Sequence, residues 1–231
     1  MNNLAVIPAR SGSQRIPKKN IKDFFGKPII AYPIELAIES NLFDEVIVST
    51  DSPEIESIVV KYGASVPFLR SEKNSNNFAT LTDVILEVIQ VYEKLDITID
   101  SICCILPTSV LISQKNLLDG YNKFKNNDLS SLIPVLRFAY PIQRALKEDS
   151  GLLSFREPEF AISRSQDMEP YYHDSGQFYW IKANKIVKEK SIFTSKTGYL
   201  ELAEIETQDI DTQMDWDILK IKFGYKNQIM H

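Results

Sequence analysis

The chain gathers positive charge in one short stretch near its beginning, IPARSGSQRIPKKN, residues 7–20. Arg10, Arg15, Lys18 and Lys19 lie there around one glycine, Gly12, although the formal net charge of the protein is -5. Guanidinium and ammonium groups neutralise phosphate oxygens, and a glycine lets backbone N–H groups approach a ligand closely. The stretch therefore predicts a clamp for a polyphosphate. The same residues also fit a solvated loop whose charges keep the protein soluble.

A pair of carboxylates, Asp209 and Asp211, lies near the other end of the sequence in the stretch DIDT. Side chains two residues apart in an extended segment point the same way, so the pair can share a hard cation such as Mg2+. Acidic residues before a helix are also common caps of that helix. A phosphate clamp and a metal-binding pair in one chain favour nucleotidyl transfer, in which a substrate hydroxyl attacks the α-phosphate of a nucleoside triphosphate.

Several other classes of site are not expected. The P-loop motif G-x-x-x-x-G-K-[ST] and the dinucleotide motif G-x-G-x-x-G are both absent from the sequence. The histidines are His173 and His231, and the cysteines are the adjacent Cys103 and Cys104, so we do not expect a zinc site with nitrogen and sulfur ligands. The acidic overall charge argues against binding to nucleic acid.

The elements that must position these groups alternate between strand and helix. Buried strands are expected at residues 4–7, 45–51, 101–106, 131–136, 176–183 and 199–206. Helices are expected at residues 28–41, 52–63, 80–95, 116–126 and 212–223. Ser52 and Thr212 are expected to cap two of these helices. The pattern predicts a single α/β domain over residues 1–231, a three-layer αβα sandwich with a mostly parallel, Rossmann-like sheet.

The alternation lapses between residue 137 and about residue 175, where proline, arginine, tyrosine and acidic residues gather. We interpret this segment as an insertion that forms a lid or a dimerisation arm. The sequence has no apolar run long enough to cross a bilayer and no leader with a cleavage site, which predicts a cytoplasmic protein that has no membrane partner.

Several motifs in a fixed order resemble those of the cytidylyltransferases that activate acidic nine-carbon sugars, the sialic acid group. They are IPARSGSQRIPKKN, GKPIIAY, FDEVIVSTD, VPFLR, PTS and DIDT. RSQDMEPYYHDSGQFYW, with YPIQRALK before it, is similar to the pseudaminic acid branch in particular. The resemblance implies transfer of CMP from CTP to the anomeric hydroxyl of pseudaminic acid, on the fold of nucleotide-diphospho-sugar transferases. It also implies a homodimer. CMP-sialic and CMP-legionaminic acid synthesis remain the alternatives.

The resemblance implies a role for individual residues. Arg10, Lys19 and Asp211 would be catalytic, and Asp211 would also help to deprotonate the anomeric hydroxyl. The implied nucleotide-binding residues are Arg10, Ser11, Gly12, Arg15, Lys19, Asn20, Arg70 and Thr80. Mg2+ would bind to Asp209 and Asp211.

Two positions depart from the pattern of the related enzymes. Gln14 stands where related enzymes often have lysine, so Arg15 or Lys18 is expected to compensate. Leu106 stands where the sialic acid enzymes have glutamine, which favours the pseudaminic branch.

The acidic sugar carries a carboxylate, so its site is expected to contain a guanidinium. Arg164 is the first candidate, and Arg144 is the second. Further sugar-binding candidates in the same stretch are Gln166, Tyr171, His173, Asp174, Gln177 and Tyr179. A strand tyrosine such as Tyr179 equally fits the core, and His173 equally fits a structural role.

Two other functional classes fit part of the sequence. Asp51, just after the strand in VSTD, resembles the phosphoacceptor of receiver domains, although this chain has arginines where receivers have acidic residues after the first strand. A sensor with the same fold would bind CTP without turning it over. The intact Asp209 and Asp211 pair favours the enzyme.

Overall fold

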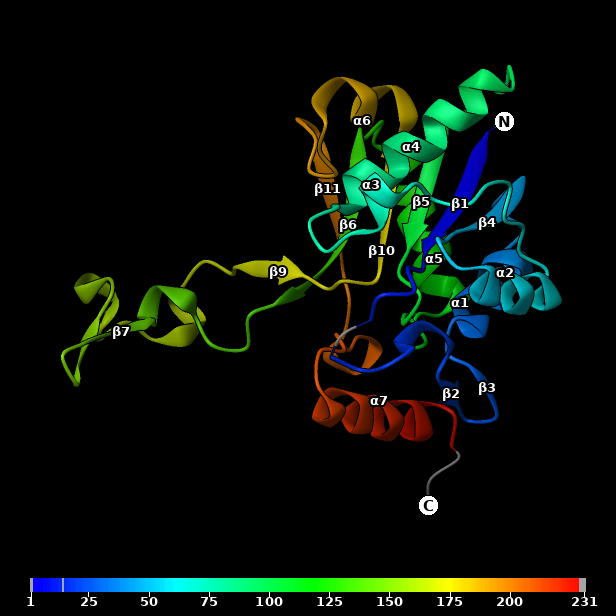
Figure 1. The fold of residues 1–231 in the computed structure, drawn as a ribbon. Helices are drawn as coiled ribbons and strands as arrows, with labels where there is room; N and C mark the ends of the chain where they lie inside the picture. Colours follow the sequence, from blue (N-terminus) through cyan, green and yellow to red (C-terminus); the bar gives the residue numbers. More distant parts are fainter. Residues whose placement is uncertain (1, 14, 229–231) are drawn as a thin grey trace.

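The computed structural model describes residues 2–13 and 15–228, and within them a seven-stranded sheet forms the middle layer (Figure 1). The strand order is β11-β6-β10-β5-β1-β4, and β9 pairs with β6. The strands are β1 (Asn3–Pro8), β4 (Glu45–Ser49), β5 (Ser101–Ile105), β6 (Ser131–Arg137), β9 (Tyr172–Asp174), β10 (Phe178–Lys182) and β11 (Thr197–Glu201). β1 pairs in parallel with β4 and β5, and β11 with β6, whereas β9 and β10 run antiparallel to their neighbours. The prediction of a mostly parallel sheet is confirmed.

Helices cover both faces of this sheet. They are α1 (Ala31–Glu39), α2 (Pro53–Val59), α3 (Glu72–Ser75), α4 (Leu81–Lys94), α5 (Gln114–Asn126), α6 (Ala183–Glu189) and α7 (Gln213–Lys226). One apolar core joins α1, α2 and α5 to one face, and a second core joins α4 and α6 to the other. Cys103 lies in the first core and Cys104 in the second, and both are buried free thiols. The three-layer architecture is therefore also confirmed.

Local signals set the ends of several helices, as the sequence predicts. The Ser52 side chain accepts a hydrogen bond from Ile55 N (3.3 Å), and Pro53 opens α2. The Thr212 hydroxyl accepts one from Asp215 N (3.3 Å), and Asp215 returns the bond in a capping box. Trp216 on the following helix packs in a third apolar cluster beside the basic stretch after β1. This packing places α7 near the loop that carries the predicted phosphate clamp.

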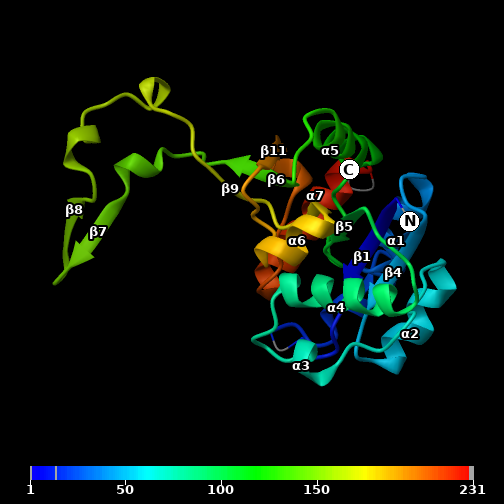
Figure 2. The same cartoon turned by 90° about the horizontal axis from the view of Figure 1, so that it is seen from above.

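The segment between β6 and β9 leaves the body of the protein as a long arm, which we call the arm and define as residues 138–171 (Figures 1 and 2). Its tip is a hairpin of β7 (Leu146–Asp149) and β8 (Leu152–Phe155). Ser150 and Gly151 join the two strands with φ of 53° and 81°, the backbone that a tight two-residue hairpin loop requires. A shorter hairpin, β2 (Asp23–Phe24) with β3 (Lys27–Pro28), follows the basic stretch. No helix in the described part of the chain is long and apolar enough to cross a membrane.

Candidate functional site

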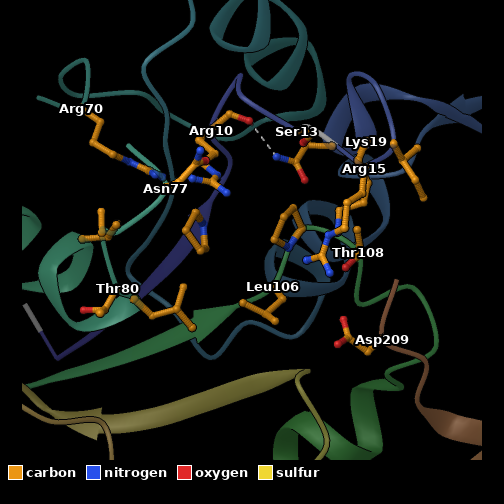
Figure 3. A pocket seen from close by; sticks show the side chains of 17 residues that line it. Arg10, Ser13, Arg15, Lys19, Arg70, Asn77, Thr80, Leu106, Thr108 and Asp209 are labelled. Carbon is orange, nitrogen blue, oxygen red and sulfur yellow. Dashed lines mark hydrogen bonds between the residues drawn. The ribbon is translucent and has the colours of Figure 1, made fainter. Parts of the chain in front are cut away.

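A cleft of about 520 Å³ opens at the carboxyl ends of β1 and β5 (Figure 3). Pro8 at the end of β1 and Leu106 just after β5 line its floor. Loops that leave the carboxyl ends of parallel strands are the usual ligand sites of such sheets. The cleft is therefore where the topology predicts a site.

Charged groups from both ends of the sequence meet in this cleft. Arg10, Arg15, Lys19 and Arg70 line it together with Asp209. In Figure 3, Arg70 and Asn77 lie at one end of the cleft and Asp209 lies at the other. The structure thus brings the basic stretch and Asp209 to one cavity, as a metal-bound triphosphate needs, whereas Asp211 is not among the residues that line it.

The basic stretch is anchored to the body by its polar residues. Ser11 donates from N and Oγ to Asp51, at 2.8 and 2.7 Å. Asn20 is buried and donates from Nδ2 to Arg10 O (3.0 Å). Lys18 pairs with Glu54 at 2.6 Å, away from the cleft. Ser11 and Asn20 therefore hold the stretch in shape. Gln14 lies outside the described residues. Lys18, expected as one replacement for the lysine that related enzymes often have at position 14, does not line the cleft.

Gly12 is not required by crowding within the chain. A Cβ placed at Gly12 would meet no atom of the described residues beyond its chain neighbours within 4 Å, and the φ of Gly12 lies outside the left-handed region. Neither Gly12 nor Ser11 lines the cleft, whereas Ser13 does. The described part of the fold therefore does not require glycine at this position.

Asp51 serves as an anchor in this structure. Both of its oxygens accept hydrogen bonds from Ser11. Burial alone would raise the pKa of Asp51, but those hydrogen bonds hold it below its usual value. A carboxylate engaged in this way is poorly suited to accept a phosphoryl group, so the structure favours the anchoring role over the receiver interpretation.

Arg70 and Thr80 line the part of the cleft that lies away from Asp209 (Figure 3). Arg70 is buried and donates to Ser49 from Nε to Oγ (3.0 Å) and from Nη2 to the carbonyl oxygen. Burial lowers the pKa of Arg70, while Asp51 opposes the shift. The Thr80 hydroxyl is used in the cap of α4, where it bonds to Asp83. Both residues line the cleft, but both are also built into the framework.

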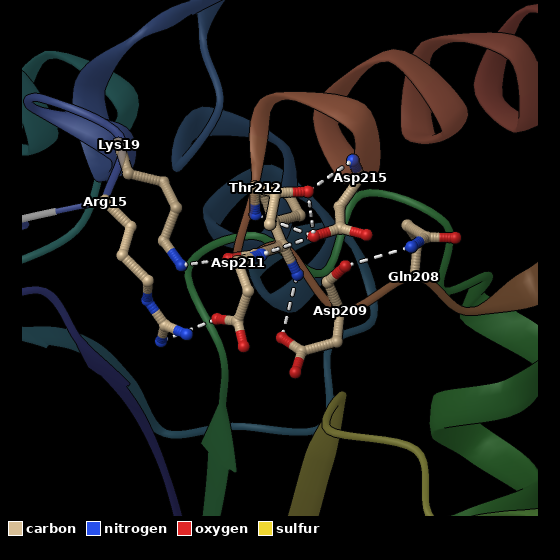
Figure 4. Close-up of polar contacts among 8 residues, drawn as sticks. Arg15, Lys19, Gln208, Asp209, Asp211, Thr212 and Asp215 are labelled. Atoms are coloured by element: carbon tan, nitrogen blue, oxygen red, sulfur yellow. Dashed lines mark hydrogen bonds and ion pairs between the residues drawn. The ribbon is translucent and has the colours of Figure 1, made fainter. Parts of the chain in front are cut away.

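The basic stretch is tied to the DIDT loop (Figure 4). Arg15 Nη2 lies 2.6 Å from Asp211 Oδ1 in an ion pair whose side chains are 67% and 43% exposed. Lys19 Nζ donates to Ile210 O at 2.6 Å, between the two aspartates. Burial lowers the pKa of Lys19, and the carboxylates of Asp209 and Asp211 oppose this shift. The basic stretch therefore reaches across the cleft and holds the DIDT loop.

The two aspartates offer hard oxygen ligands, as Mg2+ requires. Asp209 Oδ1 accepts a hydrogen bond from Ile210 N (2.8 Å), and Asp211 Oδ1 faces Arg15. Within residues 2–13 and 15–228 no group of three or more His, Cys, Asp or Glu side chains could hold a metal. This small donor set fits Mg2+, which keeps several waters and is bound through one or two carboxylates plus substrate phosphates. It does not fit a metal bound by protein ligands alone.

The residues predicted to bind sugar fall into two places. Arg164, Gln166 and Tyr171 lie on the arm, where Arg164 Nε pairs with Asp167 at 2.9 Å. None of these three lines the cleft. A single copy of the chain therefore does not bring Arg164 to Asp209.

The remaining sugar candidates lie at the base of the arm. Gln177 is 2% exposed and donates to the carbonyl oxygens of Ser175 and Gly176, so its role in this structure is structural. Tyr179 is also buried and donates to Asp174 Oδ2 (2.8 Å). Burial, followed by Asp174, raises the pKa of Tyr179. These two side chains fit the core interpretation better than the sugar-binding one.

A second groove of about 510 Å³ begins where the cleft ends, because Asp209 lines both. His173 lines this groove, as does Arg137 at the end of β6. The sequence analysis did not identify Arg137 as a functional residue, nor Ser13, Asn77 and Thr108 in the cleft. The sequence did contain a signal for Arg137. This arginine ends a buried strand, and the predicted site lies at the carboxyl ends of such strands.

Comparison with known proteins places the chain among nucleotidyltransferases. Residues 4–223 match the profile of a family described as cytidylyltransferase. A pseudaminic acid cytidylyltransferase of Campylobacter jejuni is 40% identical over 230 residues, 99% of both chains. A CMP-N,N'-diacetyllegionaminic acid synthase of Legionella pneumophila is 34% identical over 226 residues, 94% of both. A solved CMP:2-keto-3-deoxy-manno-octonic acid synthetase complexed with CTP shares the fold, with TM-score 0.71 at 19% identity over 98% of this chain and 100% of that one.

Proposed function

The chain belongs to the cytidylyltransferase family, and we propose that it transfers CMP from CTP to pseudaminic acid. The observation that carries the proposal is that Arg10 and Lys19 share one cleft with Asp209. The 40% identity to pseudaminic acid cytidylyltransferases over nearly the whole chain supports the choice of sugar. CMP-legionaminic acid synthesis is the second candidate, because a synthase of that product is 34% identical.

The reaction joins the anomeric oxygen of the sugar to the α-phosphorus of CTP. The bond from the α-phosphorus to the oxygen that bridges to the β-phosphate breaks, and diphosphate leaves. In this arrangement Arg10 and Lys19 bind and orient the triphosphate, and Asp211 receives the proton of the anomeric hydroxyl. Mg2+ held by Asp209 and Asp211 would neutralise negative charge on the phosphates when bound. The protein needs no covalent nucleophile of its own.

Diphosphate release from CTP would test the proposal, measured with Mg2+ and, in turn, with pseudaminic, legionaminic and sialic acids. Pseudaminic acid is expected to give the highest kcat/KM, by about 10-fold or more, because a site built for polar substituents rejects sugars that misplace them. A reaction without any acid is the control. CTP binding without diphosphate release with any of the three acids would identify a sensor instead of an enzyme.

We also propose that the protein is a homodimer in which the arm contacts a second copy. The tip of the arm exposes Leu146, Leu152 and Leu153, the last two at 75% and 67%, and Ile162 near them in sequence is 96% exposed. Large exposed apolar patches on a soluble protein mark interaction sites. A second copy of the same chain is the economical partner, because a two-fold axis lets the same surface serve both copies.

The double variant Leu152→Asp/Leu153→Asp is expected to convert the dimer to a monomer, because two carboxylates cannot be buried in an apolar interface without a large cost. Sedimentation equilibrium measures the change. Leu118→Asp on α5, at a leucine that is 45% exposed and outside the arm, is the matched control and should stay dimeric. A wild-type protein that sediments as a monomer would contradict the proposal.

We also propose that the enzyme is located in the cytoplasm. Cys103 and Cys104 are free, buried and on opposite faces of β5. Unpaired cysteines fit a reducing compartment and so support this proposal.

A further inference from the structure

The second groove continues from the body of the protein toward the arm. A third groove, of about 450 Å³, shares Arg137, Phe138 and Glu204 with it and adds Gln166 and Tyr171 of the arm. The three hollows are therefore joined through shared lining residues, from the nucleotide cleft at Asp209 to the base of the arm. Arg137 lies at the junction between the second and the third.

The charges along the second groove single out Arg137. Its described lining residues include two basic side chains, Arg137 and Lys222, and the acids Glu201, Glu204 and Asp209. The Lys222 ammonium is already used, because it donates to the carbonyl oxygens of Glu204 (2.9 Å) and Thr207 (2.8 Å).

Arg137 itself is exposed, and its guanidinium forms no hydrogen bond or ion pair with any other residue in 2–13 and 15–228. An arginine that faces a groove in this way has its planar set of donors open to a ligand.

The chemistry of the acceptor sets where its carboxylate must lie. In an acid of this class the carboxylate is attached to the anomeric carbon, so it lies within two bonds of the hydroxyl that attacks CTP. That hydroxyl must meet the α-phosphate near Asp209, where the cleft and the second groove join. Near Asp209, Arg15 and Lys19 already bind the DIDT loop, and Arg164 lies on the arm beside Asp167. Arg137 lines the second groove and is open to the carboxylate.

We propose that Arg137 binds the carboxylate of the acceptor sugar and so selects acidic over neutral sugars. The inference rests on the proposed function, because it assigns a residue to the acceptor side of that reaction. A guanidinium and a carboxylate form two parallel charge-assisted hydrogen bonds, a geometry that lysine cannot reproduce. The contact is made before the chemical step, so its loss should appear in the KM of the sugar.

Steady-state kinetics of Arg137→Ala test the proposal. The KM of pseudaminic acid is expected to rise about 10- to 100-fold, with the KM of CTP and kcat within about threefold of wild type. Arg137→Lys should recover only part of the loss. Arg156→Ala is the matched control, because Arg156 is an exposed arm arginine that lines none of the three hollows.

A substrate change gives a second, independent measurement. With the C1 amide of pseudaminic acid, the wild-type enzyme should lose the advantage that Arg137 provides, and Arg137→Ala should be no worse than wild type. A KM for pseudaminic acid that is unchanged in Arg137→Ala but raised in Arg164→Ala would overturn the proposal and assign the carboxylate to the arm. Failure of the wild-type enzyme to release diphosphate with any acid would instead refute the proposed function.

Discussion

Asp211→Ala is expected to lower kcat by about 100- to 1000-fold, because it removes a carboxylate that would hold Mg2+ beside the reacting phosphates and a proton acceptor for the anomeric hydroxyl. The KM of CTP should not rise. In the wild-type protein Arg15 is paired with Asp211 at 2.6 Å, so the variant releases a guanidinium that can turn to the triphosphate. Initial rates of diphosphate release at saturating sugar and varied CTP measure both quantities.

The fold of this variant should be intact. The Arg15–Asp211 pair is largely exposed, at 67% and 43%, and pairs of that kind stabilise a protein by about 0–1 kcal/mol. The Tm should therefore change by less than about 4 °C. Asp217→Ala is the matched control, because Asp217 lies on α7 and accepts only from Gln213 in the described chain. A kcat of Asp211→Ala within about threefold of wild type would remove Asp211 from the mechanism, and Asp211→Asn would show whether its charge is the property that matters.

The fold was largely predictable because its signals are local. Apolar runs such as residues 4–7 and 101–106 mark buried strands, and Ser52 and Thr212 mark helix starts, without reference to the rest of the chain. The direction of β10 was not predictable. The stretch FYWIK has the same pattern in either direction, and only its pairing with β5 and β6 makes it antiparallel.

The site was predictable where charge alone defines it. The basic stretch and the DIDT pair stand out in an acidic protein. Arg10, Arg15 and Lys19 line the cleft with Asp209, and Asp211 is paired with Arg15. Roles that depend on where a side chain points could not be predicted. Gln177 is a polar residue in a mostly apolar run, and only the structure shows that its amide is used by neighbouring carbonyls. The separation of Arg164 from the cleft depends on the path of the arm, which no local pattern encodes.

Lys19→Met is expected to lower kcat/KM for CTP by about 100-fold or more, the second largest effect in this chain. The Lys19 ammonium joins the basic stretch to the DIDT loop through its hydrogen bond to Ile210 O (2.6 Å). Methionine is unbranched and only one heavy atom shorter than lysine, but it removes both the charge and this bond. The lost hydrogen bond should cost about 1 kcal/mol of stability, so the variant should still fold, as a circular dichroism melt would show.

The pH dependence separates the charge of Lys19 from its shape. Burial lowers the pKa of Lys19 below the ordinary value of 10.5, so the side chain loses its proton at a lower pH than an exposed lysine does. The protonated form binds the triphosphate, and kcat/KM for CTP reports the free enzyme, so kcat/KM should fall as pH rises through that lowered pKa. Lys19→Arg keeps its charge at every accessible pH, and its fall in kcat/KM should move to higher pH. If kcat/KM for CTP falls over the same high-pH range in wild type and in Lys19→Arg, a group other than Lys19 titrates there. That conclusion would hold whatever the effect of Lys19→Met.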